Sequence, residues 1–166
     1  VYPPMSTQLQ AQGIELIEGF GPEQISLQPD LFVVGNVVSR GNPLMEEILN
    51  GGFPYTSGPQ WIGEHILQGK WVLAVAGTHG KTTTASMLAW ILERCGLRPD
   101  YLIGGFAANF SAPARLSGAD IVVIEGDEYA SCFDDQRAKF LYYNPEVVVI
   151  TNIVEDHPDL YPDVQT

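Results

Sequence analysis

The sequence has 166 residues, of which 45% are hydrophobic, so it can build one or two small cores. Its 8 Lys and Arg residues face 20 Asp and Glu residues, and the formal net charge of −12 argues against nucleic acid as a partner. No apolar run approaches the roughly 18 to 20 residues that cross a bilayer, and the first residues lack a basic and apolar leader, so we expect no membrane association and no export.

The residues before position 70 predict short strands that alternate with helices. We expect a strand over 31–35, a helix over 44–50, a strand over 53–56 and a helix from 57 to about 67. Asn42 and Pro43 form an N-cap and a first-turn proline, and Gly51 and Gly52 are suited to end the same helix. This alternation is typical of the α/β class.

A second, mostly parallel sheet is predicted from residue 70 onward. The run 71–77 is continuously apolar, as in a strand that is buried on both faces, and 120–125 and 147–151 are two more candidates for such buried strands, each ending in polar residues. Between the first two runs, residues 82–95 predict an amphipathic helix that ends before Gly96. The expected apolar face of this helix comprises Met87, Leu88, Ile91, Leu92 and Cys95. Because parallel strands end at one edge of a sheet, we expect the polar residues that follow the three strands to converge.

The two cysteines are Cys95 and Cys132, and they lack the spacing of a zinc or dithiol redox site. We interpret both as reduced thiols of a cytoplasmic protein. Because Cys95 lies on the predicted apolar face of the helix, we expect it to pack in a core.

Residues 75–82, VAGTHGKT, lead from a predicted strand through a glycine loop into a predicted helix, which is the context of a phosphate-binding loop. Glycine lets phosphate oxygens approach backbone N–H groups, and the helix N-terminus favours negative charge. Lys81 supplies a charge for the β- and γ-phosphates of a nucleotide, and the Thr82 hydroxyl can bind Mg²⁺. The loop is a variant, since Val75 stands where the usual pattern has its first glycine and Gly77 follows two residues later.

A magnesium–nucleotide site also needs carboxylates at neighbouring strand ends. Glu125 ends a predicted strand after four apolar residues, so we predict that it binds a cation. For Asp127 and Glu128, which follow at once, solvated surface charge is an equally good interpretation.

Polar residues also crowd the end of the last predicted strand, in TNIVEDHPDLY at 151–161. The crowded residues are Thr151, Asn152, Glu155, Asp156, His157 and Asp159. A single histidine is more often a surface residue than a ligand, but His157 follows a buried strand beside two acids. We therefore predict a metal or substrate role for it.

Three segments together resemble the central domain of the Mur ligases: AGTHGKTTT at 76–84, EGDEY at 125–129 and TNIVEDHPDLY at 151–161. These enzymes use ATP to phosphorylate a carboxylate and then let an amine displace the phosphate. The resemblance implies that residues 1–56 end a Rossmann-like UDP-binding domain and that residues 57–69 form a connector helix. Residues 70–166 would begin a P-loop, Mur-type ATPase domain with a mostly parallel sheet. We expect such a fragment to be inactive alone.

The resemblance also implies the cofactors and the site residues. ATP would be held by Gly77, Thr78, His79, Gly80, Lys81, Thr82 and Thr83, and Mg²⁺ by Thr82, Glu125 and His157. Lys81, Glu125 and His157 would take part in catalysis. Asn109 resembles a family position that faces the sugar nucleotide. Asn36 and Arg40 could meet the same substrate, although loops use such residues for capping about as often.

The implied substrates are UDP-N-acetylmuramate and a cell-wall peptide or amino acid. The segments at 1–7, 57–61, 70–85 and 139–143 are most similar to family members that add L-alanyl-γ-D-glutamyl-meso-diaminopimelate in peptidoglycan recycling. Members that add L-alanine are the alternative within the family. Two further alternatives are a P-loop kinase or NTPase and a non-catalytic module that binds UDP-muramyl compounds.

Overall fold

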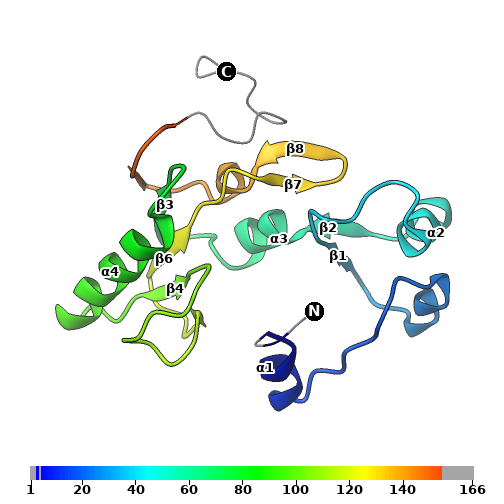
Figure 1. Cartoon of the computed structure of the whole chain (residues 1–166), viewed down its shortest axis with the longest axis horizontal. Coiled ribbons are helices and arrows are strands. Elements are labelled where there is room, and N and C mark those ends of the chain that lie inside the picture. The colour runs from blue at the N-terminus through cyan, green and yellow to red at the C-terminus, as the bar shows by residue number, and fades with distance from the viewer. Residues whose placement is uncertain (1–2, 4, 155–166) are drawn as a thin grey trace.

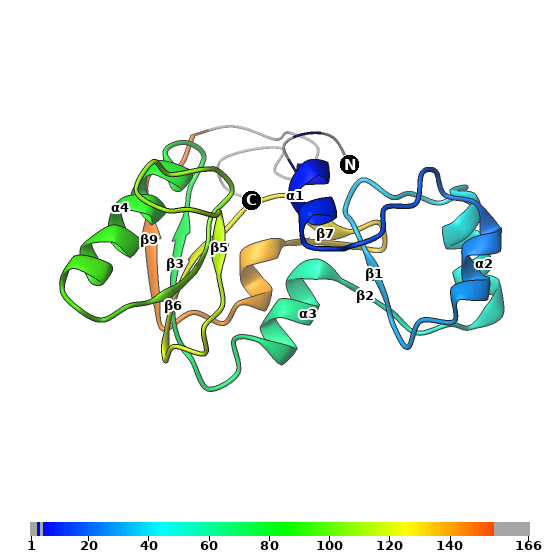
Figure 2. The same cartoon turned by 90° about the horizontal axis from the view of Figure 1, so that it is seen from below.

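The structure is a computed structural model that describes residue 3 and residues 5–154 of the chain. Its elements form an N-terminal group (residues 5–65) and a sheet group (residues 71–150); in Figure 2 the large sheet lies at the left and β1, β2 and α2 at the right, with α3 between them. The N-terminal group comprises α1 (Met5–Ala11), the 3-10 helix η1 (Pro22–Leu27), β1 (Phe32–Val34), α2 (Pro43–Gly51), β2 (Tyr55–Ser57) and α3 (Gly58–His65). The sheet group comprises β3 (Trp71–Ala76), α4 (Lys81–Arg94), β4 (Asp100–Leu102), β5 (Ala114–Arg115), β6 (Ile121–Glu125), β7 (Ala130–Cys132), β8 (Asp135–Ala138), the 3-10 helix η2 (Lys139–Tyr142) and β9 (Val147–Ile150). In the described part of the chain, no helix is both long enough and apolar enough to span a membrane.

The N-terminal group contains the two helices that the sequence predicts, α2 and α3, with ends that differ from the predicted ones by one or two residues, whereas α1 and η1 were not predicted. The Asn42 side chain accepts a hydrogen bond from the Met45 N–H at 3.1 Å, and Gly52 ends α2 with a φ of 65°. Ser57 caps α3 by accepting a hydrogen bond from the Gln60 N–H at 3.2 Å. Strands β1 and β2 pair in parallel. The second strand begins two residues later than predicted.

The sheet group is built on a five-stranded sheet in the order β5-β4-β6-β3-β9. Only β5 runs antiparallel to its neighbour. Strand β3 lies between β6 and β9, with Val75 opposite both Glu125 and Val149. The three strands whose polar ends the sequence predicts to converge are therefore adjacent, and their carboxyl ends share one edge.

Helices cover both faces of this sheet (Figure 2). On one face, Val72 and Ala74 of β3 pack with residues of α3, of η2 and of the segment after α3. On the other face, Val75 of β3 packs against α4 through Ala85 and Ala89, which are fully buried. The result is the three-layer arrangement of an α/β fold, as predicted.

The buried face of α4 differs from the predicted one. Met87 and Ile91 are 59% and 54% exposed, and Cys95 is exposed, so the prediction that Cys95 packs in a core is wrong. The face that packs on the sheet consists of Ala85, Leu88, Ala89 and Leu92, at the helical spacing i, i+3, i+4 and i+7. Two alanines on this face let the helix approach the sheet closely, and the larger side chains turn outward.

Strand β9 also departs from the prediction of a strand buried on both faces. All four of its residues are exposed. It pairs with β3, and no described strand pairs with its other edge.

The hairpin of β7 and β8 is an element that the sequence did not predict, and it connects the two groups (Figure 1). Cys132 is buried in a cluster with Val34, Met45 and Ile48 of the N-terminal group, and this burial raises the pKa of its thiol. At the tip of the hairpin, Asp134 accepts a hydrogen bond of 2.6 Å from the Tyr55 hydroxyl. The hairpin therefore supplies part of the core of the N-terminal group.

Candidate nucleotide-binding site

The loop between β3 and α4 requires glycine at two positions. Gly77 has a φ of 118°, and a Cβ atom there would lie 2.4 Å from Thr151 Oγ1 and 2.7 Å from the Asn152 carbonyl oxygen. Gly80, with a φ of 81°, is the N-cap residue of α4, and no side-chain hydrogen bond caps this end of the helix. The N–H groups of the first turn of α4 therefore receive no side-chain cap, which is the condition for binding an anion there.

Lys81, the first residue of α4, folds back over this loop. Its ammonium group donates hydrogen bonds to the carbonyl oxygens of Gly77 at 2.8 Å and Thr78 at 3.3 Å. It also forms an ion pair of 2.8 Å with Glu128 Oε2, and the two side chains are only 11% and 15% exposed. Glu128 is therefore not a solvated surface charge. Its carboxylate pairs with Lys81, the residue that the sequence predicts to bind the phosphates.

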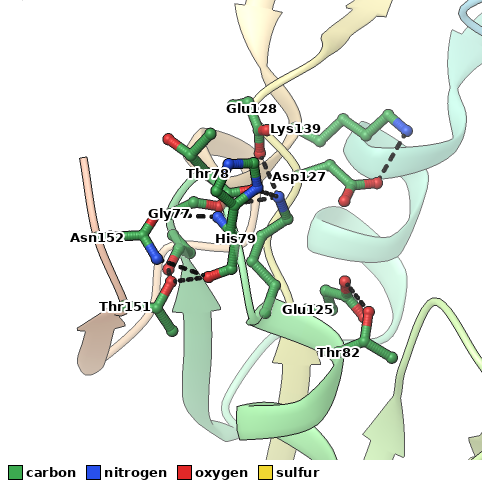
Figure 3. Close-up of polar contacts among 12 residues, drawn as sticks. Gly77, Thr78, His79, Thr82, Glu125, Asp127, Glu128, Lys139, Thr151 and Asn152 are labelled. Atoms are coloured by element: carbon green, nitrogen blue, oxygen red, sulfur yellow. Dashed lines mark hydrogen bonds and ion pairs between the residues drawn. The ribbon is translucent and has the colours of Figure 1, made fainter. Parts of the chain in front are cut away.

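Thr82 and Glu125 come together at the end of β6, as the sequence predicts for a magnesium site. The Thr82 hydroxyl donates a hydrogen bond of 2.7 Å to Glu125 Oε1 (Figure 3). Glu125 Oε2 accepts one of 2.7 Å from the Gly104 N–H. A hydroxyl and a carboxylate are oxygen donors that suit Mg²⁺. Within residue 3 and residues 5–154, no three His, Cys, Asp or Glu side chains form a group that could hold a metal. Oxygen atoms of phosphate or water could add to the coordination of an Mg²⁺ ion bound by Thr82 and Glu125.

Thr151 and Asn152, which follow β9, brace the loop (Figure 3). The Asn152 side chain accepts a hydrogen bond from the His79 N–H and donates one to the His79 carbonyl, both at 2.9 Å. The Asn152 carbonyl accepts from the Thr78 N–H at 3.2 Å, and the Thr151 hydroxyl donates to the His79 carbonyl at 2.6 Å. The sequence shows both residues in a polar cluster but does not reveal their bracing role, because that role depends on contacts with His79, 72 and 73 positions away.

These contacts divide the predicted phosphate-binding residues into two sets. The N–H groups of Thr78 and His79 are already hydrogen-bonded to Asn152. The N–H groups of Lys81, Thr82 and Thr83 belong to the uncapped first turn of α4. The geometry therefore favours the helix N-terminus as the direct phosphate contact and the preceding loop as its frame.

A cleft of about 400 Å³ opens beside Glu125, between the sheet edge and the N-terminal group. Its lining includes Gly35, Asn36, Gly104, Glu125, Asp127, Ser131, Lys139 and Tyr143. Burial and the charge of Asp127 raise the pKa of Tyr143 to about 12, so its hydroxyl is neutral at physiological pH. Asn36, a predicted substrate residue, thus shares a cavity with the predicted magnesium ligand.

The remaining predicted site residues lie elsewhere. Arg40 does not line this cleft, and its guanidinium binds Glu46 through contacts of 2.8 and 3.0 Å, which favours the loop-capping interpretation. This hydrogen bond from Arg40, together with one from the Gly41 N–H, lowers the pKa of Glu46 to about 2. Asn109 lines a separate hollow of about 300 Å³ with Thr82 and Thr83. His157 lies outside the described residues.

The chain matches two family models. Residues 75–166, more than half of the chain, match the Mur ligase middle domain, and residues 1–70 match the Mur ligase family, catalytic domain. The chain belongs to the Mur ligase family. The two matched regions meet between residues 70 and 75, where the first strand of the large sheet begins.

Individual Mur ligases are similar over nearly the whole chain. The UDP-N-acetylmuramate–L-alanyl-γ-D-glutamyl-meso-2,6-diaminoheptandioate ligase of Escherichia coli is 52% identical over 165 residues, which is 99% of this chain and 36% of that ligase. A UDP-N-acetylmuramate–L-alanine ligase of Syntrophomonas wolfei is 32% identical over 96% of this chain and 32% of its own length. The chain therefore spans about a third of the length of these curated relatives.

A solved Mur ligase structure has the same fold. The crystal structure of the UDP-N-acetylmuramate:L-alanyl-γ-D-glutamyl-meso-diaminopimelate ligase from Neisseria meningitides superimposes with a TM-score of 0.95 at 51% identity. The match covers 99% of this chain and 54% of that one. The α/β fold and the mostly parallel sheet that the sequence predicts are thereby confirmed.

Proposed function

We propose that this chain is the nucleotide-binding part of an ATP- and Mg²⁺-dependent ligase of peptidoglycan recycling. The complete enzyme would join the carboxylate of UDP-N-acetylmuramate to the amine of L-alanyl-γ-D-glutamyl-meso-diaminopimelate. Relatives named for this peptide are 50% and 52% identical to the chain, whereas those named for L-alanine are 30% to 34% identical. This difference supports the peptide as the substrate over L-alanine.

One juxtaposition carries the proposal. At a single sheet edge, an uncapped helix N-terminus and the Lys81 ammonium lie beside the Thr82–Glu125 pair. Such an edge can hold a triphosphate by backbone N–H groups, a point charge and a metal ligand set.

The proposed division of labour follows the elements. Residues 1–56 would end the UDP-sugar domain, residues 57–69 would be the connector, and residues 70–166 would begin the ATPase domain. The cleft that contains Asn36 and Glu125 lies between the first and the last of these parts, which supports it as the place where the two substrates meet. A cytoplasmic location accompanies the proposal, because ATP is a cytoplasmic metabolite.

The roles of the residues follow from the contacts. The first turn of α4 would bind the triphosphate. The Lys81 ammonium would release its hydrogen bonds to the Gly77 and Thr78 carbonyls and donate to the β- and γ-phosphates instead. Thr82 and Glu125 would hold Mg²⁺, which offsets the repulsion between the incoming carboxylate and the γ-phosphate. His157 would hold a second metal ion. Attack of the carboxylate on the γ-phosphate gives an acyl phosphate and ADP, and the peptide amine then displaces phosphate.

The experiment is a substitution of Lys81 or Glu125 by alanine in the complete ligase, with ADP release measured as a function of both UDP-N-acetylmuramate and the peptide. We expect each variant to lose at least about 100-fold in kcat/KM, because each removes a charge at the reacting phosphate. Matched controls are Arg94→Gln, at the far end of α4, and the exposed Asp120→Asn, before β6. Wild-type turnover in either site variant would refute the assigned role.

The same assay separates the ligase from a kinase or NTPase. A ligase forms an acyl phosphate that hydroxylamine traps as a hydroxamate, whereas phosphate transfer to a hydroxyl or to water gives none. A non-catalytic binding module would bind UDP-N-acetylmuramate without any ADP release.

A further inference from the structure

The cleft beside Glu125 is lined by a lysine, Lys139, that has no role in the proposed mechanism. Of the described residues that line it, Glu125 and Asp127 carry negative charge and Lys139 alone carries positive charge. The Lys139 ammonium lies 3.3 Å from Asp127 Oδ2 and 5.7 Å from the centre of the Tyr129 ring. A substrate anion that enters this cleft therefore meets two carboxylates and one ammonium group.

The chain holds Lys139 in place on both sides. Its backbone N–H donates a hydrogen bond of 3.2 Å to the Tyr129 carbonyl, and the preceding residue, Ala138, is buried. The following residue, Phe140, packs on Gly126, where an added Cβ atom would lie 2.9 Å from Phe140 Cβ. The Lys139 side chain itself is only 21% exposed. Its ammonium is thus confined to the cleft, unlike that of a lysine on a solvated surface.

The two lysines of the site, Lys81 and Lys139, pair with different carboxylates and lie at different places. Glu128 pairs with Lys81 on the loop, whereas its neighbour Asp127 points toward Lys139 (Figure 3). Lys81 contacts the loop that would hold ATP. Lys139 lines the cleft that also contains Glu125, so it faces whatever is brought up to the nucleotide from the other side.

We propose that Lys139 binds the reacting carboxylate of the sugar nucleotide, exchanging its contact with Asp127 for the substrate. This inference rests on the proposed function and adds a substrate-binding residue to it. With Mg²⁺ on Glu125, a carboxylate that enters the cleft would still be repelled by Asp127, and a charge-assisted hydrogen bond from Lys139 offsets that repulsion and orients one oxygen. We favour the carboxylate over the diphosphate as the group that Lys139 binds. Lys139 shares its cavity with Glu125, the proposed magnesium ligand, and the reacting γ-phosphate would bind beside that magnesium ion.

The test uses the complete ligase with Lys139→Met, which keeps the length of the side chain and removes its charge. We expect the KM for UDP-N-acetylmuramate to rise about 10-fold or more, since a hydrogen bond to a charged group is lost, while the KM for ATP changes less than about two-fold. Lys139→Arg should restore most of the affinity. The matched control is Arg137→Gln, two residues earlier, in β8, because the Arg137 guanidinium pairs with Asp135 and its side chain is 66% exposed.

A second arm identifies the group that is bound. UDP-N-acetylglucosamine has the diphosphate but lacks the carboxylate, and it serves as a competitive inhibitor in the same assay. We expect Lys139→Met to leave its inhibition constant unchanged. Equal weakening of both sugar nucleotides would assign Lys139 to the diphosphate and overturn the proposal.

Failure of this inference can be distinguished from failure of the proposed function. If the unmodified ligase releases no ADP in response to UDP-N-acetylmuramate, the proposed function is wrong. If the unmodified ligase is active and Lys139→Met leaves the KM for UDP-N-acetylmuramate and the KM for ATP unchanged, only the role of Lys139 is refuted. A rise in both KM values together with a lower melting temperature would show that Lys139 merely supports the hairpin, which also refutes the proposal.

Discussion

Asn152 holds the proposed phosphate-binding loop in its observed shape. It makes three hydrogen bonds to the loop, two through its side chain to His79 and one through its carbonyl to Thr78. Because the Asn152 carbonyl and Thr151 Oγ1 leave no room for a Cβ atom on Gly77, the end of β9 and the loop are fitted to one another. If the loop binds a nucleotide as proposed, the affinity should therefore depend on Asn152 through its contacts with the loop.

Asn152→Ala is expected to weaken binding of a non-hydrolysable ATP analogue by about 10-fold. Two side-chain hydrogen bonds of about 0.5 to 1.5 kcal/mol each are lost, and the loop must be ordered again when the phosphate binds. Isothermal titration calorimetry measures this change. Asn50→Ala, at the exposed end of α2, removes the same side chain outside the site and should bind as the wild type does. Unchanged affinity in Asn152→Ala would show that the loop keeps its shape without this brace.

Among elements, β4 is tied to the turn that follows β5 by one buried carboxylate. Asp100 accepts hydrogen bonds from the Ser117 hydroxyl and from the backbone N–H groups of Ser117, Gly118 and Ala119, at 2.7 to 3.0 Å. Burial alone would raise the pKa of Asp100, but these hydrogen bonds outweigh burial and leave the pKa below its usual value. The ionised form of Asp100 therefore stabilises the fold.

Asp100→Asn should lower the free energy of unfolding at pH 7 by about 1 to 3 kcal/mol, because an amide N–H₂ would face buried N–H donors. A carboxylate with a depressed folded pKa stabilises the protein above its unfolded pKa of about 3.9 and loses that contribution as the pH falls through the folded value. The difference in the free energy of unfolding between variant and wild type should therefore be largest at pH 7 and decrease below about pH 4. Urea titrations across this range test it, with the exposed Asp120→Asn as control. A difference independent of pH would contradict the role of the charge.

Sequence patterns predicted some elements well and others poorly, for identifiable reasons. Strands β3 and β6 were found because their apolar runs are continuous and buried. The same apolar pattern in β9 led to a wrong prediction of burial, because residue type does not reveal which strand lies at an edge of the described sheet. The β7–β8 hairpin was missed because its sequence, ASCFDDQRA, has no alternation of apolar and polar residues.

For the molecule as a whole, the β7–β8 hairpin couples the two groups. It lies in the chain just after the acidic segment that contains Asp127 and Glu128, yet Cys132 and Phe133 pack in the core of the N-terminal group. The Phe133 ring stacks on Tyr55 with centroids 6.1 Å apart. A short, packed connection therefore links the N-terminal group to the residues beside the proposed nucleotide site.

Phe133→Ala should loosen this connection. Loss of a partly buried aromatic side chain is expected to cost about 2 to 3 kcal/mol of unfolding free energy. We expect the urea midpoint to fall and limited proteolysis to cut more rapidly between the two groups. Phe20→Ala removes an exposed ring of the N-terminal group and serves as the control. If both variants unfold and are cleaved alike, the hairpin does not couple the groups.

The sequence alone determined the loop VAGTHGKT, the helix caps and the polar ends of three strands, because these depend on neighbouring residues and on local backbone geometry. It also indicated the family. Only the tertiary structure decided that Asn152 braces His79, that Glu128 pairs with Lys81 and that Lys139 faces the cleft with Glu125. The Asn152 and Glu128 contacts join residues 73 and 47 positions apart, and the Lys139 placement brings together positions 139 and 125. Such pairs become neighbours only when the strands assemble in the order β6-β3-β9 and the hairpin packs against the N-terminal group.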